Sequence, residues 1–307
     1  MSYEVIVIGA GPAGLTAGIY LARARLKAVI LEKLAPGGQV IITTKVENYP
    51  GFPEGINGPD LMFLFEKQVR NLGIEIKQAF TVNEIKLEGE KKLIIGEDET
   101  LETKAVIIAT GARFKKLGVP GEERLIGRGV SYCATCDAPF FQGLDVAVVG
   151  GGNTAIVEAL HLTKFAKRVY LIHRRDALRA AKALQEEAFK NEKMTFVWNT
   201  VVREIKGEEK VEGLILENVK TGEKEELKVN GCFVFIGLVP NSELVKDLVK
   251  LDERGYIVTD VYCQSSIAGI FAAGDVRSSP LKQIATAVGD GAIAAVGAEK
   301  YLSGWKM

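Results

Sequence analysis

The chain has 307 residues, of which 47% are hydrophobic and 25% are charged, and its formal net charge is zero. This composition is typical of a globular enzyme, and the balanced charge excludes a general attraction to nucleic acid or to a membrane surface. No apolar run reaches the roughly 18 residues that a membrane-spanning helix requires, and no secretory signal pattern precedes the first apolar segment. We therefore expect a cytoplasmic protein of about two domains.

The N-terminal segment has the pattern of a nucleotide-binding unit. An apolar strand (residues 5–8) leads into the glycine-rich turn 9–14, a helix of small residues (15–24) and a second strand (28–31) that ends at Glu32. In such a unit the glycines permit a tight bend and close approach of a pyrophosphate, and the acid accepts hydrogen bonds from ribose hydroxyls. A glycine turn that binds no ligand is the alternative, and the joint presence of strand, turn, helix and acid argues against it.

The residues after this unit predict a long loop, one helix and a meander. The loop 33–53 is rich in glycine and proline, which is typical of a functional or disordered segment. An amphipathic helix follows at 58–71, then alternating strands with turn signals at 75–102, then a fully apolar strand at 105–109. The helix residues expected to face the core are Leu61, Leu64, Phe65 and Leu72.

A pair of cysteines separated by two residues, Cys133 and Cys136, follows in the middle of the chain. Two such thiols can close a small disulfide ring and pass on two electrons by thiol–disulfide exchange. A zinc site needs two further ligands, but Cys232 and Cys263 are isolated, and neither histidine has a matching spacing. We therefore predict a redox pair rather than a metal site, and we expect Cys232 and Cys263 to be buried side chains.

A second segment repeats the order of the first. Its expected elements are strands at 146–149 and 169–172 around the glycine-rich turn 150–155 and helix 156–163, then a helix at 176–191, alternating strands at 195–229 and a strand at 233–236. The repeat predicts an α/β protein with two Rossmann-like three-layer dinucleotide-binding domains, each with a β-meander, the second inserted into the first.

The C-terminal part differs from both units. A strand at 269–275 ends in an acid, and a helix at 284–301 is dense in alanine and glycine, which permits close packing. We predict that this tail completes the first domain, which then consists of residues 1–113 plus 243–307. Residues 114–242 form the inserted domain, which carries the cysteine pair.

The residues after the second strand of each unit indicate which nucleotide fits. Glu32 in the first unit suits a plain ribose and repels a 2′-phosphate, so this unit is expected to bind FAD or NAD. Arg174 and Arg175 stand at the same point of the second unit, with Arg179 about one helical turn beyond. Arginine donates paired hydrogen bonds to phosphate, so the second unit is expected to bind NADPH. A pair of solvated surface arginines is the alternative.

Together these motifs resemble the low-molecular-weight thioredoxin reductases of bacteria and archaea, in the class II pyridine nucleotide–disulfide oxidoreductase family. The similarity extends over nearly the whole chain, and its most specific part is the motif 133–137 followed by the turn 150–155. The other matching stretches are 9–14, 37–39, 47–51, 109–111, 173–176 with Arg179, and 271–275.

The resemblance implies a homodimer with one FAD per subunit that uses NADPH to reduce thioredoxin or a thioredoxin/glutaredoxin-like protein. The FAD-binding residues it implies are Gly9, Gly11, Pro12, Ala13, Gly14, Glu32, Lys33, Gly38, Gln39, Asn48, Val82, Ala109, Thr110, Gly111, Gly274, Asp275, Lys282, Gln283 and Ile284. The NADPH-binding residues it implies are Gly150, Gly152, Asn153, Thr154, His173, Arg174, Arg175, Arg179 and Gly237.

The resemblance also implies the catalytic roles. Cys136 faces the flavin, Cys133 attacks the disulfide of the partner protein, and Asp137 moves the proton. From its position alone, Asp137 also fits a turn residue. Arg128 is implied to contact the partner protein, although an ordinary exposed arginine fits its position equally well.

The sequence departs from the family pattern at two places. Lys282 stands where relatives often carry arginine, so the paired donors of a guanidinium group are missing there. Ala138 and Pro139 follow the catalytic acid where relatives often have glycine, which stiffens that loop. Neither change removes a reacting group.

The inserted domain is expected to move. It carries both the cysteine pair and the NADPH site, both must reach one flavin, and a thiol must also reach a bulky partner. We therefore predict a hinge rotation on linkers near residues 113–118 and 240–243. The rival functions are an NAD(P)H oxidase or ferredoxin-linked flavoprotein of the same fold, which needs no dithiol, and a non-catalytic redox sensor.

Overall fold

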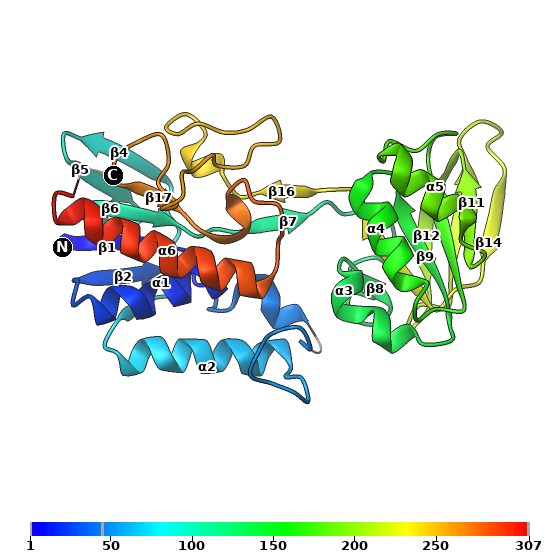
Figure 1. Ribbon diagram of the computed structural model, residues 1–307, viewed down its shortest axis with the longest axis horizontal. Helices are drawn as coiled ribbons and strands as arrows, with labels where there is room; N and C mark the ends of the chain where they lie inside the picture. Colours follow the sequence, from blue (N-terminus) through cyan, green and yellow to red (C-terminus); the bar gives the residue numbers. More distant parts are fainter. Residues whose placement is uncertain (1, 44–45, 306–307) are drawn as a thin grey trace. The chain divides into compact units, whose positions relative to one another are not determined.

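A computed structural model describes residues 2–43 and 46–305, so positions 44 and 45 of the predicted loop 33–53 lie outside the described residues. The chain divides into two compact units (Figure 1), of which one contains Met1–Arg113 and Val239–Met307 and the other contains Phe114–Leu238. The second part of the first unit thus begins at Val239, a few residues before the start at 243 that the sequence predicted. The two linking strands, β7 (Ala112–Phe114) and β16 (Leu238–Pro240), pair with each other.

The described part of the first unit is built on a seven-stranded sheet in the order β3-β2-β1-β6-β5-β4, with β17 also paired to β6. The strands are β1 (Ser2–Ile8), β2 (Ala28–Leu31), β3 (Glu75–Lys77), β4 (Glu84–Glu88), β5 (Lys91–Ile95), β6 (Thr100–Ile108) and β17 (Ile270–Ala272). The long β6 pairs antiparallel with β5 along its first half and parallel with β17 along its second half.

One part of the predicted meander is wrong. β3 pairs parallel with β2 and therefore extends the nucleotide-binding sheet, so only β4, β5 and the start of β6 form the antiparallel meander. A three-residue strand is too short for its alternation to distinguish the two arrangements.

Helices cover one face of this sheet. α1 (Pro12–Arg23) and α6 (Ile284–Leu302) lie side by side there (Figure 1), and α2 (Gly58–Asn71) packs beside α1. The two faces of β1 separate two cores, because Val5 and Val7 pack toward the helices while Ile6 and Ile8 pack on the opposite side with the segment 245–276. This alternation is what a strand buried on both faces requires.

The predicted apolar stripe of α2 is only partly buried. Leu61 is fully buried and Phe65 is half-buried, whereas Leu64 and Leu72 are 43% and 42% exposed. The helix also buries Met62 and packs on the short 3-10 turn η1 (Gly38–Ile42), which is a narrower surface than a sheet. The contact of α2 with this turn, rather than helical periodicity alone, decides which leucines are covered.

The second unit contains a parallel sheet in the order β11-β10-β9-β15-β8 and a separate antiparallel sheet β12-β13-β14. The parallel strands are β8 (Val130–Ser131), β9 (Asp145–Gly150), β10 (Arg168–His173), β11 (Met194–Trp198) and β15 (Gly231–Phe235). The antiparallel strands are β12 (Thr200–Lys206), β13 (Gly213–Asn218) and β14 (Lys224–Leu227).

The second unit has the predicted three layers, but the predicted alternating segment 195–229 is partly wrong, because its first strand, β11, pairs parallel with β10. Val146 and Val148 of β9 face the helices α3 (Ala134–Asp137), α4 (Asn153–Leu162) and α5 (Lys182–Lys190), whereas Ala147 and Val149 face the antiparallel sheet. A short 3-10 turn, η2 (Ala138–Phe141), follows α3. Both units therefore have the Rossmann-like α/β architecture that the repeated sequence pattern indicated.

Helix α5 begins at Lys182 and not near 176 as predicted. The backbone N–H of Arg179 donates to the Gly151 carbonyl at 2.7 Å, and the N–H of Ala181 donates to Asn153 Oδ1 at 2.8 Å. These bonds hold the segment before α5 against the second glycine-rich turn, and its N–H groups are thus not available to a longer helix.

Candidate functional site

The carboxyl ends of four parallel strands meet at one edge of the first sheet. Ile8 of β1 pairs with Leu31 of β2 and with Ile108 of β6, and Ile108 also pairs with Ala272 of β17. Ligands of such sheets bind outside this edge. The predicted FAD residues that directly follow these strand ends are Gly9, Glu32, Ala109, Thr110, Gly111, Gly274 and Asp275.

The first glycine-rich turn leaves room for a phosphate. Gly9 has a φ of 106°, and a Cβ there would lie 2.4 Å from the Ala109 carbonyl oxygen, so no other residue fits. A Cβ at Gly14 would lie 1.8 Å from the Gly9 carbonyl oxygen. A Cβ at Gly11 would meet only the Gly38 Cα, at 3.9 Å, and no side chain caps the start of α1. The first N–H groups of α1 are therefore open to an anion.

Glu32 is fixed beside this turn by the backbone. Its Oε2 accepts a hydrogen bond from the Ala10 N–H at 2.8 Å, and its Oε1 accepts one from the Leu34 N–H at 2.9 Å. Each carboxylate oxygen keeps a second lone pair for a hydroxyl group. The Phe80 N–H donates to the Glu32 carbonyl at 3.0 Å, which brings the segment that contains Val82 to the same place.

Two other predicted FAD residues are joined directly. The Asn48 side-chain amide donates to Gln283 Oε1 at 2.9 Å, although 235 positions separate them in the chain. Gln283 is also the N-cap of α6, where it forms a capping box with Thr286. The loop that contains Asn48 is thereby attached to the start of α6, next to Ile284.

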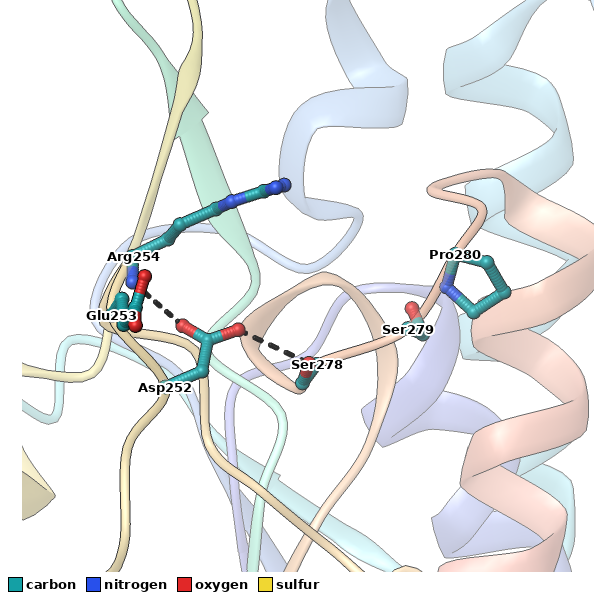
Figure 2. Close-up of a pocket in the computed structure, with 6 residues that line it drawn as sticks. All are labelled: Asp252, Glu253, Arg254, Ser278, Ser279 and Pro280. Atoms are coloured by element: carbon teal, nitrogen blue, oxygen red, sulfur yellow. Dashed lines mark hydrogen bonds between the residues drawn. The ribbon is translucent and has the colours of Figure 1, made fainter.

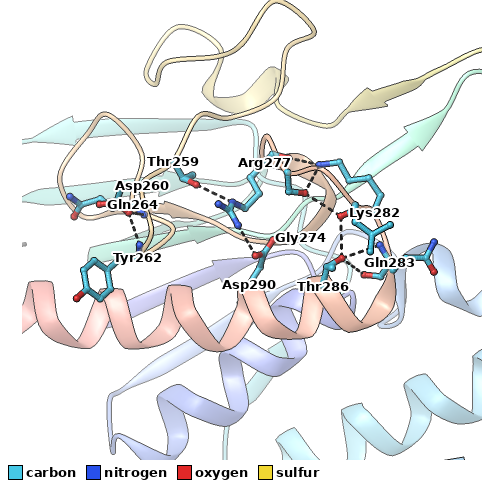
Figure 3. Close-up of polar contacts among 12 residues, drawn as sticks. Thr259, Asp260, Tyr262, Gln264, Gly274, Arg277, Lys282, Gln283, Thr286 and Asp290 are labelled. Atoms are coloured by element: carbon cyan, nitrogen blue, oxygen red, sulfur yellow. Dashed lines mark hydrogen bonds and ion pairs between the residues drawn. The ribbon is translucent and has the colours of Figure 1, made fainter. Parts of the chain in front are cut away.

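A buried ion pair supports the turn at Gly274 and Asp275 (Figure 3). Asp290 on α6 accepts the Gly274 N–H at 3.2 Å and pairs with Arg277 at 2.6 Å. Arg277 also donates to the Thr259 hydroxyl at 2.9 Å. Burial raises the pKa of the Asp275 carboxyl to about 6, while nearby Lys282 opposes that shift. The turn thus presents a carboxylate that is costly to keep charged without a ligand.

Lys282 is occupied by its own loop. Its ammonium group donates to the Arg277 carbonyl and, at 3.0 Å, to the Ser279 hydroxyl, and it lies 4.4 Å from the centre of the Tyr256 ring. Burial lowers its pKa. Figure 3 shows the Lys282 side chain directed back onto the 277–282 loop, so its ammonium group is already bonded within that loop.

A nearby pocket between two loops is lined by Asp252, Glu253, Arg254, Ser278, Ser279 and Pro280 (Figure 2). The Asp252 carboxylate accepts from the N–H of Arg254 at 2.9 Å, from the N–H of Tyr256 at 3.0 Å and from the Ser278 hydroxyl at 3.1 Å. These bonds tie the turn 252–256 to residue 278. The pocket contains none of the predicted site residues.

In the second unit, the glycine-rich turn also opens onto free space. A Cβ at Gly152 would meet nothing within 4 Å, and no side chain caps the start of α4. Asn153 and Thr154 are exposed there. His173 is buried and lies directly beneath the turn. A Cβ at Gly151 would lie only 2.3 Å from its ring. Burial lowers the pKa of His173, which keeps the imidazole neutral.

Three arginines surround this turn. Arg174 and Arg175 follow the carboxyl end of β10, and the backbone of Arg179 is bonded to Gly151. All three side chains are exposed, and within the described ranges none of them forms an ion pair. Gly237, the last predicted residue, accepts a hydrogen bond from the Lys115 N–H at 2.9 Å.

Cys133 and Cys136 form a disulfide, with their Cα atoms 5.3 Å apart. Cys133 is the N-cap of α3, and its Sγ accepts the Cys136 N–H at 3.2 Å. The Ser131 hydroxyl donates to Asp137 Oδ2 at 2.6 Å and accepts the Cys133 N–H at 3.1 Å. Burial raises the pKa of the Asp137 carboxyl, and the bond from Ser131 opposes part of that shift. The arrangement places a proton-carrying group beside a redox disulfide.

Four residues that hold these sites were not predicted from the sequence. Ser131 anchors Asp137, Asp290 anchors Gly274, Asn241 bonds the backbone of Thr110, and Glu158 bonds the turn after Cys133. Glu158 is the only acid of α4, which was a usable signal; the others have no local pattern that marks them. As predicted, Cys232 and Cys263 are buried.

The described residues contain no cluster of His, Cys, Asp and Glu side chains that could hold a metal ion. Among the same residues, none of the helices has the length and apolar character needed to cross a membrane.

Comparison with known proteins agrees with this geometry. A family model described as pyridine nucleotide-disulphide oxidoreductase matches residues 3–291. Thioredoxin reductase of Peptoclostridium acidaminophilum is 48% identical over 306 residues, covering 98% of this chain and 97% of its own. The crystal structure of thioredoxin reductase from Streptococcus pyogenes matches with a TM-score of 0.93 at 48% identity, covering 99% of both chains. That from Lactococcus lactis, in its FR conformation, matches with a TM-score of 0.69 at 48% identity, covering 98% of this chain and 99% of its own.

The chain therefore belongs to the pyridine nucleotide–disulphide oxidoreductase family, which implies the use of FAD and a nicotinamide nucleotide. Within this family it is a flavoprotein oxidoreductase of the bacterial thioredoxin reductase type, and Cys133–Cys136 is its redox-active disulfide. The resemblance that the sequence motifs indicated is confirmed.

Proposed function

We propose that the protein transfers electrons from NADPH through one bound FAD per subunit to Cys133–Cys136 and then to thioredoxin or a thioredoxin/glutaredoxin-like protein. The observation that carries this proposal is the disulfide of Cys133 and Cys136 beside Asp137, on the same unit as an open, arginine-lined nucleotide turn. When bound, FAD supplies a carrier of two electrons between the nicotinamide and the disulfide.

The first unit has the features that FAD requires. The open turn at Gly11 and the start of α1 would hold the pyrophosphate. Glu32 would hold the ribose hydroxyls, and the joined pair of Asn48 and Gln283 offers amide groups to the remainder of the cofactor. Asp275, with its costly buried charge, gains stability when a ligand donates a hydrogen bond to it.

The second unit suits NADPH rather than NADH. Its turn is open at Gly152, and Arg174, Arg175 and Arg179 carry guanidinium groups without ion-pair partners in the described part of the chain. A 2′-phosphate would supply the missing negative charge, and arginine binds phosphate through paired hydrogen bonds.

The chain's own residues then carry out the exchange. The Cys133 thiolate attacks one sulfur of the partner's disulfide and forms a mixed disulfide, while the other partner sulfur leaves as a thiolate. The Cys136 thiolate attacks the Cys133 sulfur, which restores Cys133–Cys136 and releases the partner as a dithiol. Two electrons and two protons have then passed to the partner. Asp137, whose pKa is raised by burial, relays a proton at this site.

The experiment that tests the proposal is NADPH-dependent reduction of thioredoxin by the purified yellow protein, with NADH alongside. Replacing Cys136 with Ser should abolish disulfide reduction and leave the bleaching of the flavin by NADPH. Unchanged turnover of the variant would favour an oxidase or ferredoxin-linked flavoprotein. Flavin bleaching by the native protein without reduction of any protein disulfide would favour a redox sensor.

We also propose that the inserted unit rotates during turnover and that the enzyme acts as a cytoplasmic homodimer. The linkers are joined by the pairing of β7 with β16 and by a compact set of side-chain bonds: Asn241 bonds Thr110 through backbone and side chain, and Arg113 bonds Asn241 and Glu243. An engineered crosslink between the units should preserve either flavin reduction or thioredoxin reduction, but not both. A crosslinked enzyme with normal turnover would disprove the rotation, and a monomer in sedimentation analysis would disprove the dimer.

A further inference from the structure

Glu158 contacts the redox motif from the helix that starts at the nucleotide turn. Its Oε2 accepts the N–H of Ala134 at 3.0 Å and the N–H of Thr135 at 3.2 Å, which are the two amides that follow Cys133. Ala134 is fully buried and shares a core with Ala155 and Ala159 of α4. These small side chains let α3 pack closely on α4, which brings the Glu158 carboxylate within reach of both amides.

These two amides matter to the reduced form of the motif. When the disulfide opens, negative charge develops on sulfur, and thiolates in such motifs are stabilised by nearby N–H groups and positive charge. Among the described residues, the Cys133 sulfur accepts a hydrogen bond only from the N–H of Cys136, at 3.2 Å. Glu158 uses the other two amides and adds a negative charge at the turn that follows Cys133. Both effects make a thiolate at this site less stable.

We propose that Glu158 is a positioning residue that fixes the turn after Cys133 and keeps the Cys133–Cys136 pair strongly reducing. Reduction breaks the S–S bond and adds two electrons and two protons to give two thiols. A pair whose reduced form is less stable gives its electrons away more readily, just as a stabilised reduced form makes a dithiol oxidising. The proposal rests on the proposed function, in which electrons leave this pair for another protein disulfide.

The test is a redox titration of the holoenzyme with Glu158→Gln. Glutamine keeps an oxygen that can accept both amides and removes the charge. The protein is equilibrated anaerobically at pH 8 with mixtures of reduced and oxidised dithiothreitol and quenched in acid. Free Cys133 and Cys136 thiols are then alkylated and counted by mass spectrometry. We expect the equilibrium constant to favour the dithiol about tenfold more than in the native protein, which corresponds to about 30 mV for a two-electron couple.

The matched control is Glu187→Gln, an exposed glutamate on α5, which should leave the titration unchanged. Glu158→Ala removes charge and acceptor together, and its midpoint should move at least as far as that of Glu158→Gln, with a native circular dichroism spectrum showing that the fold is kept. A native midpoint for Glu158→Gln, or a shift toward a more reducing pair, would overturn the proposal, even if Glu158→Ala shifted. The titration uses neither NADPH nor thioredoxin, so its result does not depend on the proposed function. A failure of the proposed function would instead be seen as absent NADPH-dependent thioredoxin reduction by the native enzyme.

Discussion

Replacing Asp290 with Ala should destabilise the first unit by about 4 kcal/mol. Asp290 and Arg277 form a 2.6 Å ion pair whose side chains are only 12% and 17% exposed. Removing one member of a buried pair typically costs about 3–5 kcal/mol because the other charge is left uncompensated. Because both side chains keep some exposure to solvent, we expect the loss of this ion pair to cost about 3 kcal/mol, the lower end of that range. The Gly274 N–H also loses its acceptor, which adds about 1 kcal/mol.

The effect can be separated into charge and hydrogen bond. Asp290→Asn keeps an acceptor for Gly274 but not the charge, so we expect it to cost less than Asp290→Ala. In the double variant Asp290→Ala with Arg277→Met, the uncompensated cation is absent. The double variant should therefore be more stable than the sum of the two single variants predicts, by at least about 1 kcal/mol.

The assay is urea unfolding followed by the fluorescence of released flavin, which reports on the first unit. A cost below about 1 kcal/mol for Asp290→Ala would refute the reasoning, as would additive effects in the double variant. Either result would mean that water or a neighbouring group already compensates Arg277. Loss of the support at Gly274 should also weaken FAD retention by the folded protein.

Three further predictions concern the two nucleotide sites. Arg175→Gln should raise the KM for NADPH about tenfold to a hundredfold and leave the KM for NADH unchanged, because a charge-assisted bond to phosphate contributes about 1.5–3 kcal/mol. Equal effects on the KM values of both nucleotides in steady-state kinetics would contradict this prediction. The Gly152→Ala variant should fold normally, because the added Cβ meets no protein atom, but should lose NADPH binding, because the Cβ fills space left for the nucleotide. The Gly14→Ala variant should fail to retain flavin, because its Cβ would lie 1.8 Å from a carbonyl oxygen. Thermal melts and fluorescence titration compare the two variants. The raised pKa of Asp275, from 3.8 to about 6, means that the folded apoprotein binds this proton more tightly than the unfolded chain. Apoprotein stability should therefore rise as pH falls from 7 to 5, by about 1.3 kcal/mol from this group. Asp275→Asn should remove that part of the pH dependence in urea titrations, and an identical slope in the variant would disprove the assignment.

Local patterns in the sequence were sufficient for the architecture and for the reacting groups. The two glycine-rich turns, the apolar strands before them and the acid or arginines after them stand within about 25 residues of one another, as one βαβ unit requires. The cysteine pair is closer still, so its disulfide and its redox role follow from spacing. The burial of Cys232 and Cys263 could also be predicted, from their isolation and their apolar neighbours.

Tertiary packing decided what these patterns do not contain. β3 joined the parallel sheet, Leu64 and Leu72 stayed exposed and α5 began late, because each depends on which distant surface the element meets. The residues that hold the sites reach them across the chain: Glu158 lies 24 positions from Ala134, and Asn241 lies 131 positions from Thr110. Such hydrogen bonds have no sequence period, since only the folded backbone brings donor and acceptor within 3 Å.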